Sequence, residues 1–495
     1  MQNPAVLRPW AVEADCYSQL ARVQRILAGK GLIQNHFTVE NWPEGLTPST
    51  TAPFDYVILA LYEPLRLVTR YPLDWAGALV SPALWVGMVG FWMFFRSREF
   101  NAMGRFLFLI GSAALPALIW GTAFGRPRHQ SLILVLMAVA LTAEYERWHA
   151  ELTPKRVWHT VAGVGWGLAC WTSLYEPVLV VILLVVFNLI ARRRENPRFL
   201  ASFGVTMLVA WLVEGVHVFN PPPEYREALG RWLATVAEWQ GLDFAVFIRQ
   251  MTLGFVVLPF VAWGLMRRVG ERRTDLFLIL LTAVLGVLAA YQRRWIYYAN
   301  LGELFLLVRF CQDGPVRWSR AVVAGIFAMG LAVANRAYIE VVMQQNPANQ
   351  PSIELARISR SIDEPGGIMA PWWLSPGLLY FSGQPIVSGS SHCGISGIVD
   401  SAAFYSASSW PEAEALLLKR QVRWVAVWDD RAYEGYPGLN VEREILGLPD
   451  YTEDSKDEAE TTIWEILADG RNVPGALRLR AVTQKMKLYE FEPGG

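Results

Sequence analysis

The segment PVLVVILLVVFNLIARRRENPR (residues 177–198) decides the class of fold. It starts as an uninterrupted apolar block and ends in a short stretch that contains four arginines. An apolar block followed at once by arginines is typical of a helix that leaves a lipid bilayer on its cytoplasmic side. The segment therefore predicts a membrane-spanning helix.

Blocks of this kind recur along the chain, which has 495 residues, 53% of them hydrophobic, and no formal net charge. We identify about ten of them, most close to the length of roughly 17–25 residues that crosses a bilayer as a helix. They are residues 76–95, 103–123, 129–144, 158–174, 177–191, 199–218, 251–266, 275–291, 296–310 and 320–337. We predict a polytopic α-helical membrane protein with about 10–11 transmembrane helices. The absence of net charge argues against a nucleic-acid partner.

The charge of the loops predicts the topology. Arginine-rich loops belong in the cytoplasm, and four of them alternate with the blocks: 96–105, 146–156, 191–198 and 267–273. This places residues 1–75, residues 219–250 and everything after about 338 on the extracytoplasmic side. An N-terminus outside the membrane needs a signal or a first membrane helix, and MQNPAVLRPW is neither. We therefore expect that an upstream transmembrane helix is missing from this sequence; alternatively, the short N-terminus crosses the membrane unaided.

Three regions are predicted on this basis. Residues 1–75 form a first extracytoplasmic loop with an amphipathic helix within AVEADCYSQLARVQRIL (11–27). Residues 76–337 form the helical bundle, with the extracytoplasmic loop 219–250. Residues 338–495 form an extracytoplasmic α/β domain, with a helix in SWPEAEALLLKRQ, a strand in VRWVAVW and a terminal hairpin in LRLRAVTQKMKLYEFEP.

Acidic and basic residues on the outer side are the candidates for chemistry. Asp15 and Glu238 lie on separate outer loops, and carboxylate oxygens are the ligands that Mg²⁺ or Mn²⁺ prefers. Taken singly, Asp15 also suits a helix N-cap and Glu238 a solvated loop. Arg293 and Arg294 end a membrane block, where a guanidinium either binds a lipid phosphate or simply reaches the interface.

The order of these features resembles the catalytic subunit of oligosaccharyltransferase and its bacterial relatives, within the GT-C class of membrane glycosyltransferases. The resemblance implies that Asp15 is the first metal-binding aspartate and that Glu238, in TVAEWQG, belongs to a loop over the catalytic site. Arg294 or Arg293 corresponds to an arginine near the substrates. The stretch GRPRHQSL (125–132) corresponds to a second acidic motif, which implies that His129 or Gln130 lies near a metal.

Two departures from the family pattern bear on activity. Arg128 stands where the second motif has an aspartate, and a guanidinium repels a cation. Fewer protein ligands then hold the metal, or Arg128 binds phosphate in its place, or the site is inactive. The second departure is PWWLSPG, which keeps Trp372 and Trp373 of an acceptor-reading signature but lacks its aspartate and tyrosine. The acceptor is then a different peptide, a lipid or a glycan.

The function implied by the resemblance is transfer of a sugar or oligosaccharide from a polyprenyl-phosphate-linked donor to an acceptor on the extracytoplasmic face. The site residues would be Asp15 and Glu238 as catalytic carboxylates, Arg128, Arg293, Arg294, Trp372 and Trp373 as substrate contacts, and Asp15 and His129 as ligands of Mg²⁺ or Mn²⁺. The expected location is a bacterial inner membrane with a periplasmic C-terminal domain. The alternatives are a catalytically degenerate scaffold or lipid-glycan-binding subunit, and a transporter.

Overall fold

The computed structural model describes residues 8–11, 13–48, 51–96, 101–149, 156–192, 195–215, 220–267, 273–313, 317–344, 351–429, 431, 437–452 and 461–494. The chain divides into two compact units. The helical unit comprises Leu79–Gly215 and Ala237–Gln345, and the α/β unit comprises Met1–Ala78, Val216–Val236 and Asn346–Gly495.

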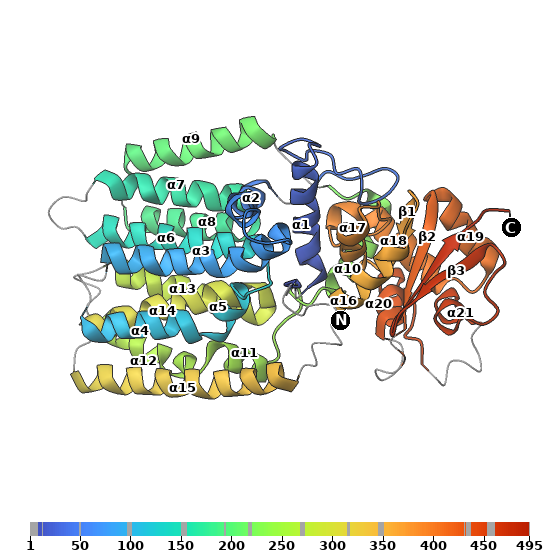
Figure 1. Cartoon of the computed structure of the whole chain (residues 1–495). Coiled ribbons are helices and arrows are strands. Elements are labelled where there is room, and N and C mark those ends of the chain that lie inside the picture. Colours follow the sequence, from blue (N-terminus) through green and yellow to red (C-terminus); the bar gives the residue numbers. More distant parts are fainter. Residues whose placement is uncertain are drawn as a thin grey trace. The chain divides into compact units, whose positions relative to one another are not determined.

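Long helices build the helical unit, and most of them run side by side in Figure 1. Their bounds are α3 (Pro72–Arg96), α4 (Ala102–Ala114), α5 (Pro116–Gly121), α6 (His129–His149), α7 (Arg156–Thr172), α8 (Tyr175–Ile190), α9 (Pro197–Glu214), α11 (Phe244–Met251), α12 (Gly254–Met266), α13 (Arg273–Tyr291), the 3₁₀ turn η2 (Arg293–Trp295), α14 (Ile296–Asp313) and α15 (Arg317–Gln344). One continuous cluster of buried apolar side chains fills the space between them. The apolar blocks of the sequence are therefore helices.

Fewer of these helices qualify as complete membrane spans than the sequence predicts. Within the described residues, Pro72–Phe95 and Pro197–Glu214 are long and apolar enough to cross a bilayer. A third candidate is the pair α11 and α12, which is bent by 65° at its break. Three of the remaining helices show why they fall short: α8 has only 16 residues, α4 ends before Pro116, and α6 carries Glu144, Glu146 and Arg147. The predicted number of ten or eleven spans is thus not confirmed.

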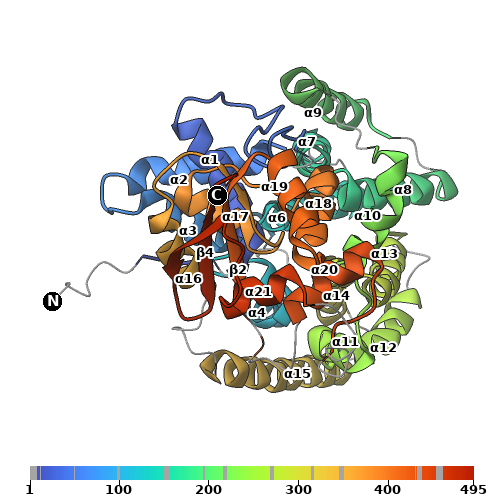
Figure 2. The same ribbon diagram turned by 90° about the vertical axis from the view of Figure 1, so that its right-hand side faces the viewer.

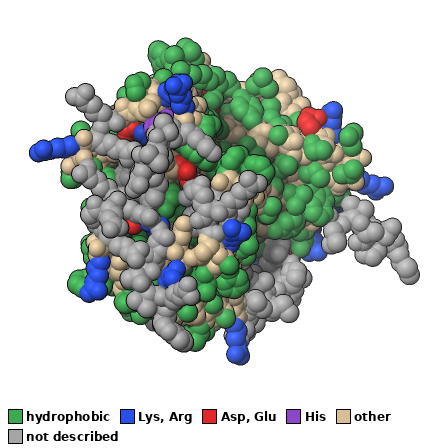
Figure 3. Space-filling view, turned by 90° about the vertical axis from the view of Figure 1, so that its left-hand side faces the viewer, with side chains coloured by type: hydrophobic (Ala, Val, Ile, Leu, Met, Phe, Trp, Pro, Cys, Tyr) green, Lys and Arg blue, Asp and Glu red, His purple; other side chains and the backbone are tan. Residues whose placement is uncertain are grey.

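Arginines gather at one end of the helical unit. They lie at or near the end of one helix or the start of the next, and all are exposed: Arg105, Arg156, Arg192, Arg198 and Arg267. Figure 3, which looks onto this end, shows Lys and Arg side chains spread across the face. The sequence-based topology predicts that this face is cytoplasmic.

Small residues bring α7 and α9 into close contact. A Cβ atom on Gly163 would lie 2.0 Å from Ser202 Oγ and 2.5 Å from the Phe199 carbonyl oxygen, and one on Gly167 would lie 2.7 Å from Thr206 Cβ. Each helix thus presents two small residues four positions apart, the pattern that lets helix backbones approach in membranes. The helix α9 lies at the edge of the bundle in both Figure 1 and Figure 2.

A four-stranded sheet organises the α/β unit. The strands β1 (Gly367–Met369), β2 (Val422–Trp428), β3 (Leu477–Val482) and β4 (Met486–Phe491) pair in the order β1-β2-β4-β3. The pair β1 and β2 is parallel, and the other pairs are antiparallel. The predicted strand and terminal hairpin are confirmed. The helices of this region are α16 (Pro351–Ile358), α17 (Ser375–Ser382), α18 (Ile395–Ser406), α19 (Trp410–Lys419), α20 (Pro437–Leu446) and α21 (Ile463–Asp469).

The N-terminal segment belongs to the same unit and pairs with the segment at Ile386, which in turn forms a bridge to Ile368 of β1. The helix α1 (Ala14–Leu27) confirms the amphipathic helix, and α2 (Pro53–Leu65) follows it. Between them, Trp42 N–H donates to the Ile386 carbonyl at 3.0 Å, and Ile386 N–H donates to the Val39 carbonyl at 2.8 Å. The Asn41 amide oxygen accepts bonds of 2.9 Å from Ser396 Oγ and Gly397 N at the start of α18. The helix α10 (Arg226–Thr235) also packs here, through Trp232.

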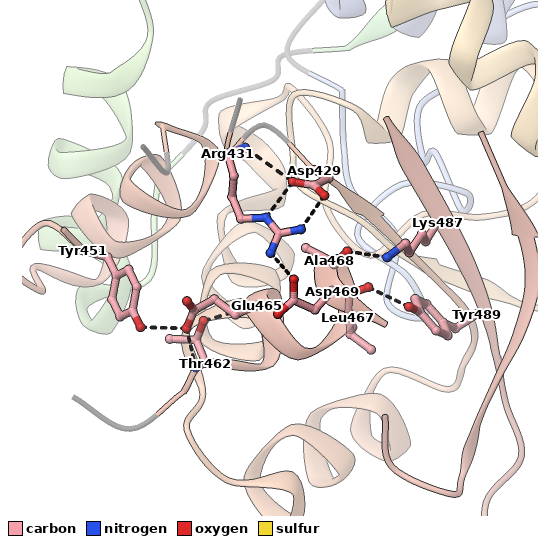
Figure 4. A network of polar contacts seen from close by, with 10 residues as sticks. All are labelled: Asp429, Arg431, Tyr451, Thr462, Glu465, Leu467, Ala468, Asp469, Lys487 and Tyr489. Atoms are coloured by element: carbon pink, nitrogen blue, oxygen red, sulfur yellow. Dashed lines mark hydrogen bonds and ion pairs between the residues drawn. The ribbon is translucent and has the colours of Figure 1, made fainter. Parts of the chain in front are cut away.

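Side chains near the ends of β2 and α21 hold α21 against the sheet (Figure 4). Arg431 donates to both Asp429 oxygens, at 2.8 and 2.6 Å, and also contacts Asp469. The Tyr489 hydroxyl donates to the Leu467 carbonyl at 2.6 Å. Because buried carbonyl groups need donors, these contacts stabilise the end of α21 where it meets β4.

The α7–α9 contact predicts the effect of adding one methyl group. Gly163→Ala should lower the free energy of unfolding of the purified protein by about 1–3 kcal/mol, because the new Cβ atom overlaps α9. The matched control is Gly204→Ala on α9, where a Cβ meets nothing within 4 Å and alanine favours the helix by up to about 1 kcal/mol. Thermal unfolding in detergent measures both, and equal stability of the two variants would contradict the packing.

Glu442 predicts a pH-dependent stability. The side chain on α20 is fully buried, and burial raises its pKa to about 8. Between about pH 4.5 and pH 8 the folded chain thus keeps this carboxyl group neutral, whereas the unfolded chain ionises it. The contribution of Glu442 to the free energy of unfolding is therefore most favourable below about pH 4.5 and is lost as the pH rises toward 8. Glu442→Gln should therefore stabilise the protein at pH 8, by on the order of a few kcal/mol, and much less at pH 5.

The control for this measurement is Glu444→Gln, an exposed carboxyl group on the same helix. Its melting temperature should follow that of the unmodified chain at every pH. A Glu442→Gln gain that is the same at pH 5 and pH 8 would show that ionisation of Glu442 is not its cause.

Candidate anion-binding site at the helix ends

A turn that contains Glu238 is fastened to the turn before α14. Arg294 N–H donates to the Glu238 carbonyl at 3.1 Å, and Arg293 N–H donates to the Gln240 carbonyl at 2.9 Å. Leu242 N–H adds a bond of 3.2 Å to the Ala290 carbonyl. These backbone bonds hold the Glu238 turn against η2.

A second loop supplies two arginines. Residues 122–128 connect α5 to α6, and the Ser81 hydroxyl of α3 donates to the Arg126 carbonyl at 2.6 Å. The Arg126 side chain donates to the Trp120 carbonyl at 2.9 Å and to the Tyr297 hydroxyl at 3.1 Å. Arg126 is therefore fixed from both sides, and its side chain is 3% exposed.

Both arginines of this loop face Glu238. Arg128 Nη1 donates to Glu238 Oε1, and Arg126 Nη2 lies 3.6 Å from the same oxygen. The Glu238 side chain is 18% exposed and that of Arg128 is 12% exposed. One carboxylate oxygen is thus shared by two guanidinium groups at the edge of the protein interior.

A third arginine completes the cluster. Arg294 Nε and Nη2 donate to Glu176 Oε1 at 3.0 and 2.5 Å, and Glu176 is fully buried at the start of α8. The guanidinium carbon lies 4.8 Å from the Tyr175 ring centre and 5.4 Å from that of Trp239. Such stacking retains a guanidinium in a partly apolar place.

The cluster carries an excess of positive charge. Arg126, Arg128 and Arg294 face Glu176 and Glu238, so three positive and two negative charges leave one positive charge with His129 neutral. Burial raises the pKa of Glu238, but the charges of Arg128, Arg126, Arg294 and His129 outweigh this and lower it below its usual value. Glu238 is therefore a carboxylate and a weak base, and the cluster as a whole suits an anion such as phosphate.

The same charges do not suit a metal ion. No group of three or more His, Cys, Asp or Glu side chains that fits a metal occurs within the part of the chain that the structure describes. Glu238 interacts electrostatically with His129, but its carboxylate is already paired with the guanidinium groups of Arg128 and Arg126. These positive charges repel a cation. The Mg²⁺ or Mn²⁺ that the resemblance implied is not confirmed.

Asp15 lies in the α/β unit. It stands in the first turn of α1, whose N-cap residue is Glu13, so Asp15 does not cap the helix. The burial of Glu40 is the main reason why its pKa is raised to about 7, and the negative charge of Asp15 raises this pKa further. The hydrogen bond from Ser391 N–H and the charge of Arg22 oppose the rise. Asp15 thus has a second carboxyl group, Glu40, within electrostatic range.

The other predicted residues are placed as follows. The Trp372 ring meets Trp232 edge-on at 5.5 Å, and the Trp373 ring meets Trp428 at 6.1 Å, within the α/β unit. Leu374 and Ser375, which follow them, are buried. Arg293 is exposed and joins the cluster only through its backbone, so of the two candidate arginines it is Arg294 whose side chain lies in it.

The sequence analysis singled out neither Arg126 nor Glu176 as a site residue. Arg126 stands two residues before Arg128 in GRPRHQ, and two arginines so close to a predicted outer helix end were an available signal. Glu176 carried no such signal, because its partner Arg294 is 118 residues away. Glu40 was likewise not singled out.

Comparison with known proteins shows the fold. No known family profile and no curated protein sequence matches the chain. Its structure is similar to that of the archaeal oligosaccharyltransferase AglB from Archaeoglobus fulgidus in complex with an inhibitory peptide and a dolichol-phosphate, with a TM-score of 0.62 and 13% identity over 89% of this chain and 68% of that chain. An Archaeoglobus fulgidus oligosaccharyltransferase in complex with Zn and sulfate gives a TM-score of 0.59 at 12% identity, over 89% of this chain and 68% of that chain.

ArnT from Cupriavidus metallidurans is similar over more of both chains. Its apo form gives a TM-score of 0.59 at 12% identity, over 98% of this chain and 94% of that chain. ArnT bound to undecaprenyl phosphate gives 0.51 at 14% identity over the same shares. The predicted resemblance to oligosaccharyltransferase and the GT-C glycosyltransferases is therefore confirmed at the level of the fold.

The charge of Arg128 predicts the metal affinity of the cluster. Arg128→Asp should create a binding site for Mn²⁺, because the change replaces a repelling charge beside Glu238 by a second carboxylate. The unmodified chain should bind no stoichiometric Mn²⁺ after treatment with a chelator. Arg192→Asp, an exposed arginine at the other end of α8, is the control and should behave like the unmodified chain. Tight Mn²⁺ binding by the unmodified chain in a titration calorimeter would contradict this assignment.

Proposed function

We propose that this chain is a GT-C-type membrane glycosyltransferase that uses a polyprenyl-phosphate-linked sugar or oligosaccharide as donor. The observation that carries the proposal is the cluster of Arg126, Arg128 and Arg294 with its surplus positive charge. AglB and ArnT are found with dolichol-phosphate and undecaprenyl phosphate, respectively. A lipid phosphate is therefore the anion that we assign to this cluster.

The cluster would act on the leaving group. In the proposed reaction, an acceptor oxygen or nitrogen attacks the sugar carbon that is linked to phosphate, and the bond from that carbon to the phosphate oxygen breaks. The departing polyprenyl phosphate gains negative charge, which Arg128 and its neighbours stabilise in a site that is mostly shielded from water. Because guanidinium groups hold this charge, no step is assigned to a metal ion.

The acceptor proton needs a carboxylate base, and we assign this role to Asp15. Glu238 suits it less, because its arginine neighbours lower its pKa. Asp15 is partly exposed at the start of α1. Trp372 and Trp373 would contact the acceptor. Since Leu374 and Ser375 offer it no carboxylate, we propose an acceptor other than the Asn-X-Ser/Thr peptide, namely a different peptide, a lipid or a glycan.

We place the reaction on the extracytoplasmic side of a bacterial inner membrane, with residues 338–495 in the periplasm. The support is the arginine-rich face at the opposite end of the helices from the cluster. In this arrangement the starts of α6, α8 and α14 meet the outer surface of the bilayer, where the phosphate of a lipid-linked donor lies.

A catalytically degenerate relative is the second candidate. Arg128, in place of the aspartate that the resemblance implies, favours it. Such a protein would bind the lipid-linked glycan through the same cluster but would release no polyprenyl phosphate. Binding and turnover measured on the same preparation separate the two functions.

The test of the proposed function uses Asp15. Purified chain is mixed with lipid-linked sugars extracted from membranes of its native host, and the release of polyprenyl phosphate is followed by mass spectrometry. Asp15→Asn should lower this release by about 10²–10⁴-fold, the usual effect of losing a general base, without changing the binding of undecaprenyl phosphate. The control is Glu13→Gln in the same helix turn. Unchanged release by Asp15→Asn would remove Asp15 from the reaction.

A further inference from the structure

We propose that Glu238 is an exchangeable counter-ion that occupies the donor phosphate site in the donor-free protein and leaves Arg128 when the phosphate binds. This inference rests on the proposed function, because it assumes a phosphate-bearing donor. It adds an order of events: the donor binds first, and its phosphate releases the Glu238 carboxylate.

The geometry of the contact supports the exchange. Arg128 and Arg126 both approach the same oxygen of Glu238. A carboxylate oxygen between two guanidinium groups stands where an oxygen of a phosphate would stand, because both anions pair with the same N–H fork. The two anions therefore compete for Arg128, because they cannot both occupy the Nη1 group that meets Glu238.

The second carboxylate of the cluster is held differently. Glu176 is fully buried and accepts two bonds from Arg294 on one oxygen and a bond of 2.9 Å from Ser173 Oγ on the other. Removing such a group from its partners would leave a buried charge, which costs about 3–5 kcal/mol. Glu176 is thus a permanent partner of Arg294.

Glu238, by contrast, is placed so that it is able to leave. Its side chain is 18% exposed and belongs to a turn, whereas its backbone is fixed by the bonds to η2. The carboxylate therefore swings toward solvent without moving the turn, while Arg126 stays anchored by Trp120 and Tyr297. Donor binding then leaves the arginines in place and frees a carboxylate beside the reacting phosphate.

Competition of this kind has a measurable consequence. A ligand binds with an apparent affinity that is reduced by the fraction of molecules whose site is free. If Glu238 occupies the site in nine of ten molecules, then removing its charge tightens phosphate binding about tenfold. A carboxylate that merely took part in turnover would not change donor affinity in this direction.

The experiment measures binding of undecaprenyl phosphate in detergent to the full chain and to Glu238→Gln. The variant should bind about tenfold more tightly, and it should release polyprenyl phosphate more slowly, so that its KM and its kcat fall together. Glu238→Ala provides a second variant, and a thermal melt of each preparation checks that it is folded. Undecaprenyl phosphate should raise the melting temperature of both variants more than that of the unmodified chain.

The matched control is Glu195→Gln. Glu195 also pairs with a buried arginine, Arg147, and is 20% exposed, close to the value for Glu238. It follows α8, whereas Glu176 is at the start of that helix, and the 16 residues of α8 separate the two ends by about 24 Å. The control removes one negative charge from the helical unit without touching the cluster, so its binding should be unchanged.

Three results would overturn the exchange. Binding by Glu238→Gln that is equal to or weaker than that of the unmodified chain refutes it, and leaves the proposed function intact. Equal tightening by Glu195→Gln refutes it as well, because the effect is then one of total charge. If no form of the chain binds undecaprenyl phosphate, the proposed donor class fails together with the exchange.

Discussion

The contact of two arginines with one carboxylate is the constraint on which one end of the helical unit depends. Arg126 and Arg128 are almost removed from water, and buried charges are tolerated only where opposite charges and hydrogen bonds compensate them. Glu238 supplies this compensation from a turn that is 110 residues away in sequence. The loop before α6, the turn before α11 and the start of α14 are therefore brought to one place. The chemistry that we assign to the cluster follows from the one positive charge that Glu238 and Glu176 do not neutralise.

The opposite end of the same unit also contains a buried polar network, of a different kind. Arg147 donates to Glu144 Oε1 at 2.6 Å and to His159 Nδ1 at 2.9 Å, and it contacts Glu195. Here one arginine faces two carboxylates, so this network has no surplus of positive charge. Both networks join helices at their ends, and the apolar core lies between them. This difference in charge balance is the reason why we propose an anion site only at the first network.

Local sequence was enough for many of the elements but not for all of them. Apolar blocks predicted the helices of the helical unit, and strand-like runs predicted β2 and the β3–β4 hairpin, because both signals depend on neighbours within a few residues. The resemblance, carried by the order of short motifs, predicted the class of fold that AglB and ArnT share. The number of membrane spans was less secure, since a hydrophobic block in the sequence does not report that its helix stops at Pro116 or bends by 65° between α11 and α12.

By itself the sequence determined that this protein is rich in apolar helical segments, and it singled out Asp15, Arg128, Glu238 and Arg294 as candidate site residues. The tertiary structure alone decided which of these charges meet. In the structure Arg128 and Arg126 both contact Glu238, and Arg294 pairs with Glu176. The side chain of Arg293 is exposed. The tertiary structure also brings the Asn41 segment to the start of α18, 355 residues away. The physical reason is that ion pairs and hydrogen bonds act over a few ångströms in space, and distance along the chain says nothing about them.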